Sequence, residues 1–255
     1  VMMGRLSLAK QIPLALSNAL GVFSNIFSSA LTKVFATNGN NSLIDEATEQ
    51  LKILTIFFTV PYAGIIAYGK DFLKLWLKAT EYTESQYTEI YVLMILVLLD
   101  IIISTYMYSI HSVFIAIDCV KVYSVILFVA SLISMSVTLI LLKFTGLGVY
   151  AIAGTSTIVL GFTHGVIVPG CAAKLLKKPI WLFWKSELKS WISLAVMSVL
   201  FVAIKFLLAL DNWKHFFISI MMVAILGYVT LFFIIFDKSE KRELIKIVKD
   251  KMIKE

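Results

Sequence analysis

One predicted helix carries polar side chains at helical spacing inside an otherwise apolar run. Residues 90–121 contain Asp100, Ser104, Tyr108, His111 and Asp118, which share one helical face with Ile115. A carboxylate, two hydroxyls and an imidazole on one face can bind a polar substrate or relay a proton along a solvated pathway. The same groups can instead form an internal hydrogen-bond network between helices. Both interpretations stay open for Asp100 and His111, whereas Asp118 is expected near Lys121 at the membrane surface.

A second polar stripe runs along the first apolar segment. Gln11, Asn18, Asn25 and Thr32 recur every seven residues, with Ser28 and Ser29 beside them. An amide offers donors and an acceptor, so Asn side chains suit sugar hydroxyls. They equally suit contacts between membrane helices, where one hydrogen bond contributes roughly 0.6 kcal/mol. Two polar stripes on different helices predict a shared hydrophilic cavity, and the candidate substrate-pathway residues are Asn18, Asn25, Asp100, Ser104, Tyr108 and His111.

Long apolar runs must position these side chains. They fall at residues 12–36, 53–68, 90–117, 122–142, 147–173, 188–210 and 216–236. A helix needs roughly 20 apolar residues to cross a bilayer, and most of the runs are that long. The chain is 60% hydrophobic and 15% charged, with a mean hydropathy of +0.91. These features predict an all-α integral membrane protein, a bundle of about seven transmembrane helices.

Two of the runs have features of their own. The run at 53–68 is short and contains Pro61, so we expect its helix to extend back to Leu43. The run at 147–173 carries Gly154, Gly161 and Gly165, a spacing that lets neighbouring helix backbones approach closely.

Lysine positions predict the orientation of the bundle. Lysines are dense in residues 174–189 and in the tail after residue 237, and Lys and Arg collect on the cytosolic side of membrane proteins. The C-terminus is therefore expected inside and the N-terminus outside, which suggests that an odd number of upstream spans is missing from this sequence. Residues 1–237 would form the transmembrane bundle, and 238–255 a basic amphipathic cytosolic tail.

Several functional classes find little support in the sequence. It has no HExxH, GxSxG, Walker or Cys/His metal-binding pattern, which favours a carrier over an enzyme. We expect no cofactor and no metal. The net charge of +7 comes almost entirely from lysines between apolar runs and at the C-terminus, so no nucleic-acid partner is expected. Cys119 and Cys171 are interpreted as small apolar residues.

Four passages, taken in order, resemble a known family. They are residues 25–53, with a small polar turn between helices, residues 59–77, residues 111–159, and the two closing spans with the basic tail. Residues 59–77 contain a Pro-bearing helix followed by a Gly-x-x-Phe-x-x-x-Trp sequence, taken as an outer loop. The order resembles the C-terminal half of bacterial polysaccharide flippases of the Wzx type, in the multidrug/oligosaccharidyl-lipid/polysaccharide exporter superfamily. Residues 69–76 and 146–154 match best.

The resemblance implies a fold and a function. Such flippases have two lobes around a central cavity, and this chain would match the last seven of about fourteen helices. The implied activity is movement of an undecaprenyl-pyrophosphate-linked oligosaccharide, the repeat unit of O-antigen, capsule or exopolysaccharide. It would cross the bacterial plasma (inner) membrane by alternating access. The implied partners are that lipid-linked substrate, the bilayer, and either a missing N-terminal lobe or a second copy of the chain.

Other functions remain alternatives. A drug/cation antiporter of the same superfamily would use Asp100 to bind Na⁺ or H⁺. A membrane-embedded glycan polymerase or acyltransferase is a further alternative, but a polymerase should show a large outer loop with arginines. The predicted outer loops are short, and Lys205 is the clearest cation inside a predicted span.

Overall fold

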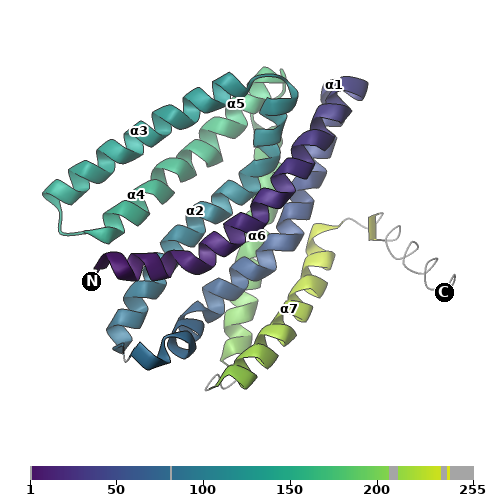
Figure 1. Cartoon of the computed structure of the whole chain (residues 1–255). Helices are drawn as coiled ribbons and strands as arrows, with labels where there is room; N and C mark the ends of the chain where they lie inside the picture. The colour runs from purple at the N-terminus through teal and green to yellow at the C-terminus, as the bar shows by residue number, and fades with distance from the viewer. Residues whose placement is uncertain (1, 81, 207–211, 237–239, 242–255) are drawn as a thin grey trace, which may run out of the picture.

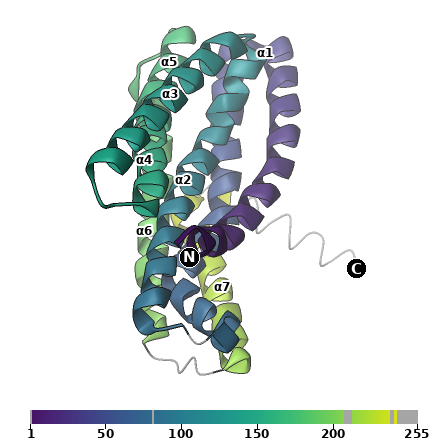
Figure 2. The ribbon, with the colours of Figure 1, turned by 60° about the vertical axis from the view of Figure 1, so that its left-hand side comes forward.

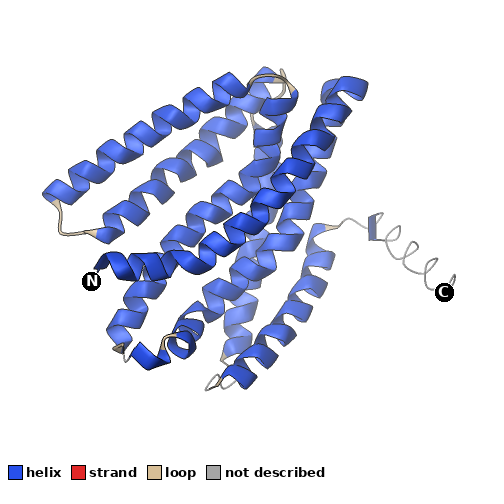
Figure 3. Cartoon of the chain, viewed as in Figure 1, coloured by secondary structure: helices blue, strands red, loops and turns tan. Residues whose placement is uncertain are grey.

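The computed structural model describes residues 2–80, 82–206, 212–236 and 240–241, and these residues form helices joined by short loops (Figure 3). The elements in chain order are α1 (Met2–Trp76), η1 (Lys78–Thr80), α2 (Glu84–Ala116), α3 (Val120–Phe144), α4 (Val149–Phe162), η2 (Thr163–Ile167), α5 (Val168–Leu175), α6 (Trp181–Lys205) and α7 (Trp213–Ile235). The short π-helical η2 joins α4 and α5 into a single span, Val149–Leu175.

Within the described residues, six helices are long and apolar enough to cross a membrane. They are α1, α2, α3, the α4–η2–α5 span, α6 and α7. The predicted all-α, multi-pass membrane class is therefore confirmed by helix length and hydropathy.

The difference between six helices and the expected seven lies in α1. Its 75 residues contain one non-helical position, Gly39, with φ 76° and ψ −166°. This backbone region is open essentially only to glycine. The chain reverses there, so residues 2–38 and 40–76 form the two arms of a helical hairpin (Figure 1). Each arm holds one of the two apolar runs that were predicted as separate helices, and the second arm does extend back beyond Leu43.

The second arm of α1 lies at the centre of the fold, where α1 packs against α2, α6 and α7. Its buried side chains, such as Leu54, Tyr62 and Tyr68, meet Leu98 of α2 and Phe201 of α6 in the largest hydrophobic cluster. On the other side, α3 and α4 form a hairpin that leans away from α6 and α7 (Figures 1 and 2). Ala130 is the one buried residue of α3, so this helix presents nearly all of its apolar surface outward.

Most connections lie at two ends of the bundle, whereas the α3–α4 link lies at the left in Figure 1. The reversal of α1, the α2–α3 link and the α5–α6 link lie at the upper end in Figure 1. Helix η1, the end of α6 and the start of α7 lie at the lower end. Lys177 and Lys74 therefore sit at opposite ends, as the predicted topology requires.

Residues 69–76 are helical, so their prediction as an outer loop was wrong. They form the last turns of α1, where a side chain at Gly69 would overlap Met94 of α2 and lie 3.3 Å from Tyr91. The loop is confined to residues 77–83, because packing on α2 keeps the polar end of α1 helical. The predicted tail, residues 238–255, lies outside the described residues except for Glu240 and Lys241.

The predicted close approach at the glycines of the fifth run occurs at one position. A Cβ at Gly161 would lie 3.1 Å from Ile103 of α2. Gly154 and Gly165 have open space at that position, so their spacing does not reflect helix contact with a described neighbour.

Candidate functional site

The polar face of α2 turns toward α4 and η2. The Thr157 hydroxyl of α4 donates to the Leu96 carbonyl of α2 over 2.8 Å, one turn before Asp100. The next α2 turn brings the Asp100 carboxyl to the Ser156 hydroxyl of α4. Ile103 then packs on Gly161, where the missing side chain lets the two helices approach. The predicted stripe therefore lies along a helix–helix contact.

Asp100 is half-buried near the middle of α2. Its Oδ1 atom is fully buried and accepts no hydrogen bond from any residue that the structure describes. Leaving one oxygen of a carboxyl without a donor costs about 1–3 kcal/mol, and more when the group is charged. An ionisable residue inside a membrane span is a functional-site hypothesis by default, and this unpaired oxygen strengthens it.

The other predicted residues of α2 continue the stripe toward α3 and η2. Ser104, Tyr108 and His111 are all half-buried. The His111 ring lies 4.5 Å from the Tyr123 ring of α3 and 6.5 Å from the Tyr108 ring, measured between centroids. The helix therefore presents its polar groups to two neighbours in turn, Asp100 to α4 and His111 to α3.

His164 joins this cluster from η2, a different element of the fold. It is buried in η2, close enough to His111 for an electrostatic interaction between the rings. Its Nδ1 has no hydrogen-bond partner in the described part of the chain. Short π-helical turns inside α-helices occur often at functional sites. Asp100, Ser104, Tyr108, His111 and His164 together are named here the α2 polar cluster.

The structure does not bring the asparagine stripe to this cluster. Asn18 is exposed on the first arm of α1, as are Gln11 and Thr32 of the same stripe. The side chain of Asn25 lies outside what the structure describes. The stripe therefore faces away from the core of this chain, toward whatever surrounds it in the membrane.

A network of buried hydroxyl groups was missed from the sequence. Thr59 and the Tyr106 hydroxyl are 3.2 Å apart, and Tyr62 bonds to Thr105, so both pairs join the second arm of α1 to α2. The spacing of Thr55, Thr59 and Tyr62 on one helical face was the available signal. These groups are paired with one another, so they hold helices together.

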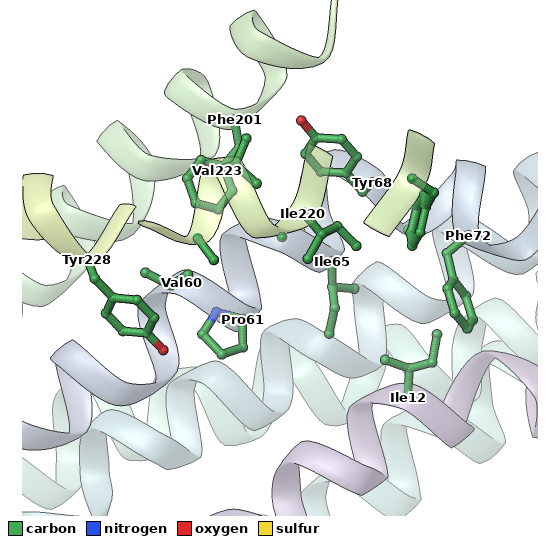
Figure 4. Close-up of a pocket in the computed structure, with 14 residues that line it drawn as sticks. Ile12, Val60, Pro61, Ile65, Tyr68, Phe72, Phe201, Ile220, Val223 and Tyr228 are labelled. Carbon is green, nitrogen blue, oxygen red and sulfur yellow. The ribbon is translucent and has the colours of Figure 1, made fainter. Parts of the chain in front are cut away.

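An apolar groove lies between α1 and α7. Its volume is about 320 Å³, and Val60, Pro61, Ile65 and Phe72 of α1 face Ile220 and Val223 of α7 across it (Figure 4). Tyr228 and Tyr68 lie at its sides (Figure 4). It contains none of the predicted pathway residues, and its lining suits acyl chains or apolar side chains.

The cation Lys205 is neutralised within the chain. Its ammonium pairs with Asp71 at the end of α1 and donates to the Ala67 carbonyl over 2.9 Å. It is thus committed to a structural contact. The described residues also contain no group of three or more His, Cys, Asp or Glu side chains that could hold a metal ion.

The chain matches no protein-family model, no curated protein and no solved structure. The fold and the site define a multi-pass membrane protein with a polar cluster, including an incompletely paired carboxyl group, inside its helices.

Proposed function

We propose that this chain is one lobe of a carrier that moves a lipid-linked oligosaccharide across the bacterial plasma membrane by alternating access. The observation that carries the proposal is Asp100, whose buried Oδ1 has no donor among the described residues. A transported polar group, an ion or water supplies the missing partner during the transport cycle. The resemblance of residues 69–76 and 146–154 to polysaccharide flippases supports the substrate class.

The exposed stripe on the first arm of α1 supports a second lobe. Gln11, Asn18 and Thr32 are exposed on a helix long and apolar enough to span a membrane. Polar side chains on such helices face a bundle interior or a water-filled cavity far more often than lipid. An opposite lobe, or a second copy of this chain, would place the stripe inside a cavity. Its amides would then contact the sugar hydroxyls.

A cation antiporter of the same architecture is the second candidate. The carboxyl group of Asp100, with one oxygen beside Ser156 and the other unpaired, suits a bound Na⁺ or H⁺. The two candidates share the helix and differ in the cargo, so one experiment can separate them.

The test expresses residues 1–255 in a bacterial strain that lacks its own flippase, alone and together with the N-terminal lobe of a full-length flippase. We expect surface glycan only when both lobes are present, because alternating access moves one lobe against the other. Efflux of a cationic dye is measured in the same cells while an inward gradient of Na⁺ or protons is imposed to drive it.

The outcomes separate the candidates. Surface glycan with both lobes and no dye efflux supports the flippase, and dye efflux without glycan supports the antiporter. Glycan restored by the chain alone, with crosslinked dimers in the membrane, favours two copies over two different lobes. If neither surface glycan nor dye efflux is detected, at normal protein level and with both lobes present, the proposal is contradicted.

A further inference from the structure

A buried carboxyl group lies near the start of α6, on a helix that carries none of the α2 polar cluster. Glu187 is 5% exposed, and it is the one Asp or Glu that is buried in the described part of the chain. Its Oε1 atom has no hydrogen-bond partner among the described residues. Asp71, by contrast, is in an ion pair, and Asp100 is only half-buried. A Glu side chain is almost never fully buried unless it is paired, so Glu187 is an exception in this fold.

The face of α6 that carries Glu187 is otherwise apolar and is covered by other helices. Phe183 lies four residues before Glu187 and Leu194 seven residues after it, and both are buried on the same helical face. Phe183 belongs to a hydrophobic cluster that α6 shares with α1, α2 and α5, and Leu194 belongs to the largest cluster. The Glu187 carboxyl group therefore lies between two hydrophobic clusters, where little water reaches it.

The nearest cations on α6 point to another face of the helix. Lys185 and Lys189 stand two positions before and after Glu187, and residues two apart on a helix do not face each other. Both lysines line a surface pocket of about 300 Å³ together with Lys52 of α1. None of the ion pairs found among the described residues includes Glu187. The lysines of this end of the bundle therefore do not neutralise its carboxyl group.

The ionisable groups of the helices packed on α6 have other contacts or lie apart from Glu187. Tyr106 of α2 is hydrogen-bonded to α1, and Glu46 of α1 accepts a hydrogen bond within its own helix. Lys214 and His215 lie in the first turn of α7, at the lower end in Figure 1, whereas α6 begins at the upper end. The exposed charged side chains of the neighbouring elements are Asp45, Glu49, Lys174 and Lys177.

A hydroxyl group one turn further along α6 has no proton to offer Glu187. Ser190 lies three residues after Glu187, so the two side chains are neighbours on the helix. The Thr55 hydroxyl donates its only proton to the Leu51 carbonyl over 2.7 Å. Ser190 must therefore donate to Thr55 across the 2.6 Å that separates the two oxygens. This use of the Ser190 proton leaves the Glu187 carboxyl group without a donor from that side chain.

These surroundings disfavour an ionised Glu187. Taking a charge out of water without a partner costs far more than burying a neutral polar group. The described contacts of Glu187 provide neither a cation nor a free hydroxyl proton to compensate a negative charge. A neutral carboxylic acid bears only the smaller cost of one oxygen atom that accepts no hydrogen bond. Glu187 therefore carries a proton in the folded chain.

We propose that Glu187 is a proton-binding site, which holds a proton at neutral pH and exchanges it at the end of the bundle where α5 is linked to α6. Glu187 lies less than two turns after Trp181, the first residue of α6. The Trp181 ring is exposed, and Trp side chains collect at membrane–water interfaces. A small opening at this end is therefore enough to let water reach the carboxyl group. The site does not involve Asp100 and does not depend on the proposed carrier function.

Infrared absorption of the purified full chain in detergent tests the proposal. A neutral carboxylic acid has a C=O stretching band at a higher frequency than the amide I band, in a region where an ionised carboxylate does not absorb. Glu187→Gln removes this acid and keeps a neutral side chain of the same shape. The matched control is Glu89→Gln, which removes another glutamate inside a span, one that is paired with Arg5.

We expect wild type at neutral pH to show the acid band, Glu187→Gln to lose intensity in it, and Glu89→Gln to keep it. The band should shift to a lower frequency in D₂O, because the bound proton is replaced by a deuteron. Glu187→Gln should change the thermal unfolding temperature by less than about 2 °C, because one neutral group replaces another. Glu89→Gln should lower it by at least about 4 °C, because the charge of Arg5 is left without its partner.

The proposal is overturned if wild type lacks the acid band or if Glu187→Gln keeps it at full intensity. A band that does not shift in D₂O also overturns it, because the acid would then be sealed and would not exchange its proton. A fall in unfolding temperature as large for Glu187→Gln as for Glu89→Gln contradicts it as well, since a charge on Glu187 would then be what stabilises the fold.

Discussion

The ammonium of Lys205, the last residue of α6, pairs with the carboxylate of Asp71, five residues before the end of α1. Both side chains are about a quarter exposed, 27% for Lys205 and 24% for Asp71. The pair ties α6 to the last turns of α1 at the lower end of the bundle. It also removes the clearest cation inside a span from the list of groups that could meet a transported anion.

Breaking this pair should lower stability more than removing it altogether. Asp71→Asn leaves the Lys205 charge half-buried without its partner, which costs about 1–3 kcal/mol. Asp71→Asn/Lys205→Met removes both charges and should recover much of that loss, since apolar replacements of ion pairs are often neutral. Thermal unfolding of the purified protein in detergent measures both. If the unfolding temperature falls equally in the single and the double variant, the unpaired charge of Lys205 is not what destabilises Asp71→Asn.

Asp100 should matter for transport beyond its effect on protein level. We expect Asp100→Asn, which keeps the shape but loses the charge, to lower transport about tenfold, equivalent to about 1.4 kcal/mol. Asp118→Asn is the matched control, because Asp118 is exposed at the end of α2 and its φ of 55° is one that Asn tolerates. Transport per amount of protein in the membrane is the readout. Full transport by both Asp100→Asn and Asp100→Ala would leave Asp100 a packing residue.

The predicted orientation places Lys177 and Lys251 in the cytosol and Lys74 outside. Single cysteines are introduced at these positions after replacing Cys119 and Cys171, which are free thiols. A membrane-impermeant thiol reagent should label position 74 in intact cells, and positions 177 and 251 only after lysis. Labelling of position 177 in intact cells would reverse the topology.

Gly227 of α7 fits against side chains of two other helices. A Cβ there would lie 2.8 Å from Phe201, 2.9 Å from Met197 and 3.1 Å from Val60. Gly227→Ala should therefore destabilise the fold by about 1–3 kcal/mol through overpacking. Gly154→Ala is the control, because that position is open. Its thermal unfolding temperature should stay the same or rise slightly. A tolerated Gly227→Ala would mean that α7 moves outward at little cost.

The sequence predicted the helices well because a membrane span is a property of local composition. The length of each apolar run was enough to place α2, α3, α6 and α7. The hairpin of α1 was also anticipated, as two runs separated by a polar turn near Gly39. Residues 69–76 were predicted as an outer loop from the resemblance of their Gly-x-x-Phe-x-x-x-Trp sequence, whereas the structure has them as the last turns of α1. Only the fold shows that Asp71 meets Lys205 and that Gly69 packs on Met94.

The candidate site was only partly predictable. Helical spacing put Asp100, Ser104, Tyr108 and His111 on one face, but it could not show which helix that face meets. The partners Ser156 and His164 lie more than 50 positions away, and nothing local marks them. Lys52 and Lys185 are each explained by the tendency of lysines to lie on the cytosolic side, and only the packing of α1 on α6 brings them to one pocket.

The reversal at Gly39 determines that α1 crosses the membrane twice and not once. A straight helix of 75 residues would be about 110 Å long, several times the hydrocarbon thickness of about 30 Å. Folding back at one residue turns that length into two crossings, so every later helix runs in the opposite sense to the one a single crossing would give. The reversal at Gly39 therefore decides on which side each later loop lies relative to the N-terminus, whereas the lysine distribution predicts which side is the cytosol.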